Sequence, residues 1–192
     1  MKALKIITAA LVVASLAAVP FTAQAAKGDQ PAGKGPSANV LVPLDEAEVA
    51  TLKWMREEEK LARDMYLTLN LYQPARIFTN IAASEQKHFD ALGKKLELYG
   101  IEDPAKVEIG QFTDPSLQIM YDDLLALGMP TYIDALKVGV IIEEADLTDL
   151  ELAIDGTDSV PLARTYQHLL TGSEHHLAAF TRLLAKAGVV LE

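Results

Sequence analysis

The sequence of 192 residues contains no cysteine and only one tryptophan, and aromatic residues make up just 6% of it. The lack of cysteine excludes disulfide bonds, zinc ribbons, rubredoxin-type sites and thiol chemistry. No stretch shows the sustained two-residue alternation of a half-buried strand, so we expect no β-sheet.

Long apolar runs are also absent after the first 25 residues. A basic start, an apolar run over Ile6–Val19 and the small residues of Ala23-Gln24-Ala25 are typical of a secretory signal peptide rather than of a membrane span. We expect residues 1–25 to be a signal peptide, cleaved near Ala25, and the protein to be periplasmic or secreted. Residues 26–43 are expected to be a flexible tether, and residues 44–192 one folded domain without a membrane segment.

Basic residues are scarce: 17 Lys and Arg stand against 27 Asp and Glu, which gives a formal net charge of -10. Lys2 and Lys5 would leave with the signal peptide, so the exported chain is more acidic still. This balance argues against nucleic acid or an anionic membrane as a partner, and it is compatible with attraction of cations. It leaves the oligomeric state open, including a homodimer.

Apolar residues recur at three- and four-residue steps in four long segments. This spacing predicts long helices over about 44–71, from beyond Pro74 to Tyr99, over 131–152 and over 160–186, with a short helix over 115–127. Two helix hairpins joined by a long crossover between the second and third long helices indicate an all-α fold. The arrangement is that of a ferritin-like four-helix bundle.

Each of the four inward helix faces carries a polar residue near its middle. In chain order these residues are Glu59, Glu85 with His88, Glu143 with Asp146, and His176. Buried carboxylates are costly unless something neutralises them, and a Glu and a His one turn apart can bind the same ion. Oxygen and imidazole ligands suit iron, manganese or zinc. The alternative is a buried polar layer whose carboxylates pair with Arg or take up protons.

Three of these segments also resemble known metal-binding helices. The run from Glu59 to Tyr66 resembles the first metal-bearing helix of rubrerythrins and ferritins, in which a ligand Glu precedes a Tyr by seven residues. Glu85-Gln86-Lys87-His88 is similar to their second-helix motif. Glu143 and Asp146 are similar to the two carboxylates, three residues apart, of the rubrerythrin third helix.

The whole domain from about Leu44 to Leu184 resembles a prokaryotic ferritin-like family of unknown function. The runs Arg56–Asp64, Ile81–Glu85 and Gly172–Leu177 carry that match. The resemblance implies a ferritin-like fold and a metal site, without an established reaction.

One position departs from the di-iron pattern. The fourth helix of those proteins carries Glu-x-x-His, whereas this chain has Ser173 three residues before His176, so the second bridging carboxylate is absent. Asp146 is an additional carboxylate that could fill the gap. We therefore expect two ions, iron before manganese or zinc, with the second one bound more weakly.

Several nearby polar residues are interpreted as structural. Glu57, Glu58 and Glu144 are expected at the surface or rim, although Glu144 is the nearest rival of Glu143 because a small helix rotation exchanges adjacent positions. His168 and His175 are expected to face solvent. The charged residues near Glu59 are expected to form ordinary helix ion pairs: Lys60, Arg63 and Asp64.

Three functions fit these features. The first is a di-metal oxidoreductase that acts on peroxide, oxygen or Fe(II), in which Glu85 bridges the ions and Tyr66 is a hydrogen-bond partner. Glu59 and His88 would complete the coordination of one ion, and Glu143, Asp146 and His176 would complete that of the other. Electrons would come from an external donor or from Fe(II). The other two functions are a non-catalytic metal-binding protein and a metal-free helical bundle for protein interaction.

Overall fold

The computed structural model of the protein describes residues 41–190, which form five α-helices and no β-strand. The helices are α1 (Glu46–Tyr72), α2 (Arg76–Tyr99), α3 (Pro115–Gly128), α4 (Tyr132–Asp155) and α5 (Val160–Lys186). The all-α prediction is confirmed, and the helix ends lie close to those expected from the spacing of apolar residues. The predicted signal peptide and nearly all of the predicted tether lie outside the described residues.

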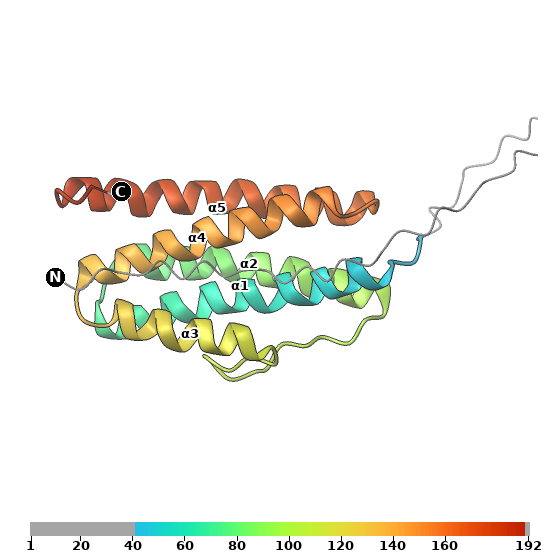
Figure 1. The fold of residues 1–192 in the computed structure, drawn as a ribbon, viewed down its shortest axis with the longest axis horizontal. Coiled ribbons are helices and arrows are strands. Elements are labelled where there is room, and N and C mark those ends of the chain that lie inside the picture. The colour runs from blue at the N-terminus through green and yellow to red at the C-terminus, as the bar shows by residue number, and fades with distance from the viewer. Residues whose placement is uncertain (1–40, 191–192) are drawn as a thin grey trace, which may run out of the picture. The chain divides into compact units, whose positions relative to one another are not determined.

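The long helices pack as two antiparallel pairs, α1 with α2 and α4 with α5 (Figure 1). Further contacts join α1 to α4 and α2 to α5. The crossover between α2 and α4 contains α3, which packs against both α1 and α4. Between residues 41 and 190, no helix combines the length and the apolar character needed to cross a membrane.

Local signals in the sequence set the helix ends. Asp45 caps α1 by accepting a hydrogen bond from the Glu48 backbone, and the Glu48 side chain accepts one from the Asp45 backbone, which forms a capping box. Gly100 ends α2 with φ 65°, a left-handed conformation that favours glycine. Asp114 caps α3, and Pro115 occupies the first turn, where its missing N–H costs nothing.

Two apolar clusters lie on either side of a polar layer. One cluster includes Tyr66, Phe78 and Phe180, and the other includes Leu52 and Leu92. On each long helix, residues of one cluster precede the polar positions and residues of the other follow them. The polar side chains are therefore held between two packed ends, which fix the rotation of each helix about its axis.

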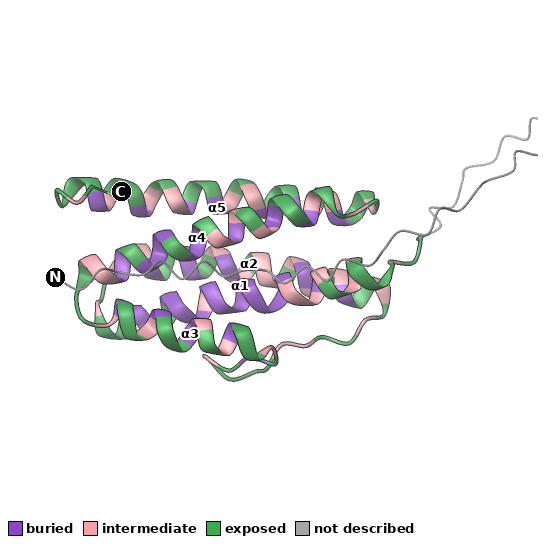
Figure 2. Cartoon of the chain, viewed as in Figure 1, coloured by how far each residue is buried: buried purple, intermediate pink, exposed green. Residues whose placement is uncertain are grey.

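Helix α1 is buried on every face along its middle. All eight residues from Met55 to Ala62 are buried, as Figure 2 shows by the colour of this helix. The expectation that Glu57 and Glu58 lie at the surface is wrong, because they are only 3% and 4% exposed. The crossover covers the outer face of α1, and α4 packs on another side.

The crossover is attached to α1 by buried polar groups. The Lys60 ammonium lies 2.5 Å from Asp64 and donates to the backbone carbonyls of Glu108 and Gln111 at 2.8 and 3.0 Å. The Glu57 carboxylate accepts the backbone N–H groups of Thr113 and Asp114, the residues that lead into α3. The ion pair expected at Lys60 thus exists, but it is fully buried and belongs to an interface with the crossover.

Candidate metal centre

Five of the predicted ligands meet in the polar layer between the two apolar clusters. Helix α1 provides Glu59, α2 provides Glu85 and His88, α4 provides Glu143, and α5 provides His176. The three glutamates are each 1% exposed, and the two histidines are only slightly more accessible. We call these five side chains the Glu/His cluster.

The Glu/His cluster consists of two groups of three that share Glu85. In each group, one nitrogen or oxygen from each residue lies within 4.8 Å of the others. Nδ1 of His88 lies 2.8 Å from Oε2 of Glu85 and 3.2 Å from Oε2 of Glu59. Nδ1 of His176 lies 2.7 Å from Oε1 of Glu85 and 3.5 Å from Oε2 of Glu143. The two oxygens of Glu85 therefore face different groups.

Several of these buried atoms lack hydrogen-bond partners among residues 41–190. They are Oε1 of Glu59, both carboxylate oxygens of Glu85 and Nδ1 of His176. Nδ1 of His88 and Oε2 of Glu59 do form a hydrogen bond, at 3.2 Å, whereas Nδ1 of His176 approaches Oε1 of Glu85 closely without hydrogen-bond geometry. Buried polar atoms are normally satisfied, so a group of orphaned atoms pointing at common positions fits an ion at those positions.

The histidines and Glu85 stabilise each other's charged forms when no ion is bound. Burial alone would raise the pKa of Glu85, but His176 and His88 outweigh it and lower this pKa to about 2. Burial would likewise lower both histidine pKa values, but Glu59 and Glu85 raise that of His88 to about 11. Glu143 and Glu85 raise the pKa of His176 to about 9. In the metal-free protein, protonated His88 and His176 therefore supply positive charge that bound cations could supply instead.

The outer two glutamates are less well compensated. Burial raises the pKa of Glu59 well above its usual value, although His88 opposes this. Burial also raises the pKa of Glu143 to about 7, and the charge of Glu85 adds to the increase. The Tyr66 hydroxyl donates a 2.6 Å hydrogen bond to Oε1 of Glu143, which is the role predicted for this tyrosine. Tyr66 thereby fixes the Glu143 carboxylate and occupies one of its two oxygens.

The sixth predicted ligand, Asp146, belongs to neither group of three. Its Oδ2 accepts a 2.5 Å hydrogen bond from the Ser173 hydroxyl, and both residues are buried. Ser173 therefore binds the very carboxylate that was expected to replace the missing fourth-helix glutamate. A three-residue step rotates a side chain by about 60° from Glu143, which is enough to turn Asp146 toward α1 and α5.

The remaining polar candidates agree with the predictions in part. Glu144 is exposed and Glu143 is buried, so Glu143 is the residue that faces the centre. His168 and His175 are exposed, as predicted. Glu58 is buried beside the cluster, on the side of α1 that faces α4, and the sequence patterns did not indicate this.

A glycine that the sequence analysis did not single out shapes the centre. A Cβ on Gly172 would lie only 2.5 Å from Nε2 of His88, so the bare α5 backbone leaves room for this imidazole. The rings of His88 and His176 lie stacked with centroids 5.6 Å apart. A glycine inside a long helix costs about 1 kcal/mol relative to alanine, and that cost was the available signal of a close approach here.

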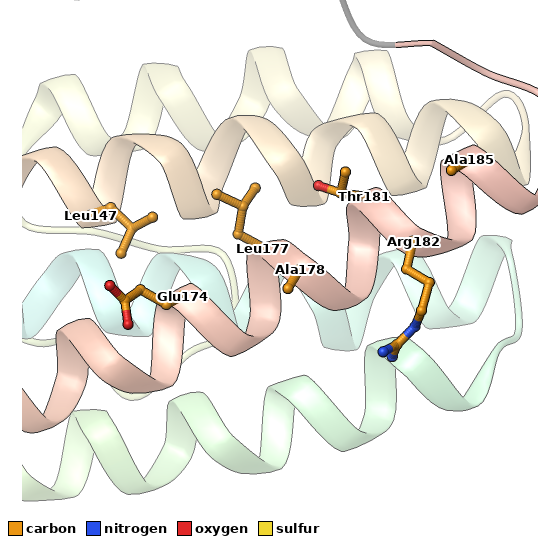
Figure 3. A pocket seen from close by; sticks show the side chains of 7 residues that line it. All are labelled: Leu147, Glu174, Leu177, Ala178, Thr181, Arg182 and Ala185. Carbon is orange, nitrogen blue, oxygen red and sulfur yellow. The ribbon is translucent and has the colours of Figure 1, made fainter.

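An open groove lies outside the Glu/His cluster. Figure 3 shows that residues of α5, together with Leu147 of α4, form its lining: Glu174, Leu177, Ala178, Thr181, Arg182 and Ala185. No member of the cluster lines it. The Glu/His cluster is therefore separate from this groove. The parts of the cluster nearest to solvent are the slightly exposed rings of His88 and His176.

The fold and the cluster together define an all-helical protein with a set of buried potential metal ligands. Residues 48–192 match DUF2202, described as an uncharacterized protein domain, and the chain belongs to this family. It is 46% identical over 147 residues to the uncharacterized protein MJ0754 of Methanocaldococcus jannaschii, a match that covers 76% of this chain and 80% of that protein.

The fold is similar to the crystal structure of the hypothetical protein MJ0754 from Methanococcus jannaschii. The TM-score is 0.78 at 44% sequence identity, and the match covers 81% of this chain and 89% of that chain.

Proposed function

We propose that this protein is an exported, ferritin-like metal-binding protein with a dinuclear carboxylate site. In this proposal α1, α2, α4 and α5 are the four helices of the bundle, and the crossover with α3 joins its two halves. The pairing of α1 with α2 and of α4 with α5 supports it, as do the contacts between the pairs. The Glu/His cluster would hold the two ions at mid-bundle.

The position of Glu85 is the observation that carries the proposal. Its Oε2 lies near His88 in one group, and its Oε1 lies near His176 in the other. A carboxylate placed in this way can bridge two ions. Donor atoms bound side by side on one ion are about 3 Å apart when each lies about 2.1 Å from it. The nitrogen–oxygen distances of 2.7–3.5 Å in the cluster fit that spacing.

The second position, that of Glu143 and His176, is proposed to bind its ion more weakly. The Tyr66 hydroxyl already occupies one oxygen of Glu143, and the other oxygen lies 3.5 Å from His176, the longest of the four contacts. Ser173 offers no carboxylate, and it holds Asp146 by a hydrogen bond. The first position keeps an unpartnered oxygen of Glu59 for its ion.

Iron is the proposed metal, with manganese or zinc as alternatives, because the donors are carboxylates and imidazoles. A bound iron or manganese pair would supply redox chemistry toward peroxide, oxygen or Fe(II). The protein's part is to hold the donors, to fix Glu143 through Tyr66 and to keep the centre dry between two apolar clusters. Electrons would come from an external donor or from Fe(II), because the chain has no cysteine for a rubredoxin-type site.

Metal analysis of the protein purified without a histidine tag tests this proposal. We expect up to two transition-metal ions per chain, and an ultraviolet–visible spectrum with carboxylate-to-iron absorption if iron is bound. Consumption of peroxide, or oxidation of added Fe(II), would distinguish an oxidoreductase from a metal buffer. Protein that takes up no iron, manganese or zinc would instead be a metal-free bundle, and the proposal would be wrong.

Metal binding by the Glu/His cluster should strengthen as the pH rises from 6 to 8. The raised pKa values of His88 and His176, about 11 and about 9, mean that both rings carry protons that an ion must displace. We expect release of at least two protons per chain at pH 7, one from each ring, with a further contribution from Glu59 and Glu143, whose pKa values burial raises. Affinity should rise by about tenfold per pH unit for each proton displaced. Calorimetric titrations in buffers with different ionisation enthalpies measure this release, and equal heats in all buffers would contradict it.

The same pKa values predict how the stability of the metal-free protein changes with pH. A histidine whose pKa is higher in the folded than in the unfolded state stabilises the fold below the unfolded value of 6.5. That contribution is lost as the pH rises through about 9 for His176 and about 11 for His88. Metal-free protein should therefore become easier to unfold above pH 8, and a bound ion should reduce this loss.

Export remains a prediction from the first 25 residues. Mass spectrometry of the protein isolated from its own cell should find an N-terminus near Ala26, because the Ala23-Gln24-Ala25 sequence is a suitable cleavage site. The fractionated periplasm or the medium should contain the protein. A chain that keeps Met1 in the cytoplasm would contradict the prediction.

A further inference from the structure

The open groove along α5 is lined mainly by short and apolar side chains. Leu147 of α4 and Leu177 of α5 are half-buried and provide its larger apolar surfaces (Figure 3). Ala178, Thr181 and Ala185 are exposed, and their short side chains leave the α5 backbone accessible. The groove has a volume of about 630 Å³, which is room for several side chains of a neighbouring helix. We call it the α5 groove.

Two charged side chains complete the lining of the α5 groove, Glu174 and Arg182, and both are exposed. Within residues 41–190, neither belongs to an ion pair. Charges on one helix pair when they stand three or four residues apart, and no opposite charge stands at those distances from either residue. Glu174 and Arg182 themselves are eight residues apart, about 12 Å along the helix axis. Each charge therefore lacks a partner on its own helix.

The two charges are arranged symmetrically about Ala178. This alanine follows Glu174 by four residues and precedes Arg182 by four, so the two side chains point about 40° to either side of it. Two α5 helices packed antiparallel around a twofold axis at Ala178 would place Glu174 of each copy opposite Arg182 of the other. One contact would then form two equal ion pairs. The short side chains between the charges let two helix axes approach to about 8–10 Å.

We propose that the α5 groove is a homodimer interface, in which α5 packs antiparallel against α5 of a second copy. A second copy is the occupant that the charges favour, because the pattern is complementary to itself. The chain has a formal net charge of -10, so two copies repel each other in most orientations, and an exposed Arg182 offsets this on the α5 face. From Thr171 to Ala185 the contact would be about 21 Å long. Contacts this small give weak, reversible association.

Sedimentation equilibrium of the protein, in the form isolated from its own cell, tests the dimer. The wild type should dimerise reversibly as its concentration rises from micromolar to millimolar. Glu174→Arg should weaken the dimer by about tenfold or more, because both ion pairs become pairs of like charges, and Arg182→Glu should do the same. The matched controls are Glu97→Arg and Lys94→Glu, which make the same charge changes at exposed positions of α2 and should leave the dissociation constant unchanged.

A mixture of the two charge-reversed variants tests the antiparallel pairing itself. A copy carrying Glu174→Arg has two arginines in the α5 groove, and a copy carrying Arg182→Glu has two glutamates. Mixed in equal amounts, they should form a heterodimer that is at least about tenfold tighter than either variant alone, because both ion pairs are restored with their signs exchanged. Local damage to the fold would not produce this recovery. Circular dichroism should show that both variants remain helical, since both positions are exposed.

Three results would overturn the interface. They are a wild type that stays monomeric at millimolar concentration, a dimer that Glu174→Arg and Arg182→Glu weaken no more than their controls do, and a mixture of these variants that associates no more tightly than each alone. The first result would mean that the α5 groove does not join two copies. Metal analysis of the same samples reports on the dinuclear centre independently, because no residue of the Glu/His cluster lines this groove.

Discussion

Replacing Glu85 with alanine should leave the protein with almost no tightly bound metal at the Glu/His cluster. The two oxygens of Glu85 face different groups of three, so a single substitution removes one donor from each proposed position. It also removes the negative charge that compensates His88 and His176. Loss of a charged ligand from a metal site lowers affinity by about 100-fold or more, since even outer-shell changes cost about 10- to 100-fold. Metal analysis after dialysis against a weak chelator measures the loss.

The contrast with His176→Ala makes this test specific to a bridging role. That variant should empty mainly the second position and keep the ion held by Glu59, Glu85 and His88. Glu97→Ala, which removes an exposed carboxylate from the same helix as Glu85, is the control and should keep both ions. Circular dichroism should show that all three variants remain helical. If Glu85→Ala keeps as much metal as Glu97→Ala, Glu85 is not a bridge and the dinuclear proposal is wrong.

Replacing Asp64 with alanine should destabilise the fold by about 3–5 kcal/mol. Asp64 and Lys60 are fully buried, and their side chains lie 2.5 Å apart. Without Asp64, the ammonium of Lys60 stays buried with only the two crossover carbonyls as partners. The Gly110 backbone N–H loses its acceptor as well, and the Arg63 guanidinium keeps only Gln86 as an acceptor. Urea unfolding of the metal-free protein, followed by circular dichroism, measures the change.

Two further variants separate an unpaired charge from general damage. Asp90→Ala removes an exposed carboxylate from α2 and should change the free energy of unfolding by less than about 0.5 kcal/mol. The double variant Lys60→Met with Asp64→Leu removes both charges, so it should be more stable than Asp64→Ala alone. A double variant that unfolds more easily than the single one would show that the contacts to the crossover, and not the unpaired ammonium, dominate.

The helices and the members of the Glu/His cluster could be predicted because both depend on local periodicity. Glu59, Glu85, Glu143 and His176 each stand at helical spacing from apolar residues, and the two apolar clusters fix the rotation of every long helix. His88 follows Glu85 by one turn and shares its face. Residues on matching stripes of neighbouring helices must meet wherever those helices pack, so no knowledge of long-range contacts was needed.

The burial of the side of α1 that the crossover covers could not be predicted in this way. Residues 100–114 of the crossover have no regular period, and nothing in their sequence indicates which helix face they cover. Glu57 and Lys60 therefore looked like residues of an ordinary solvent-exposed face. Once the contacts are known, the residue types suit them, since Glu57 accepts backbone N–H groups and Lys60 donates to carbonyls. The hydrogen bond of Asp146 could not be predicted for a related reason, because its partner Ser173 lies on another helix.

The burial of α1 on all sides has a consequence for how freely the sequence can vary. An amphipathic helix usually has one face on which substitutions are nearly neutral, and α5 has such a face at positions like Thr171, Glu174 and His175. From Met55 to Ala62, α1 has none. Random mutagenesis with a screen for soluble, folded protein should therefore accept very few changes along these eight residues, whichever way each side chain points. Replacements on the exposed face of α5 should be accepted readily in the same library.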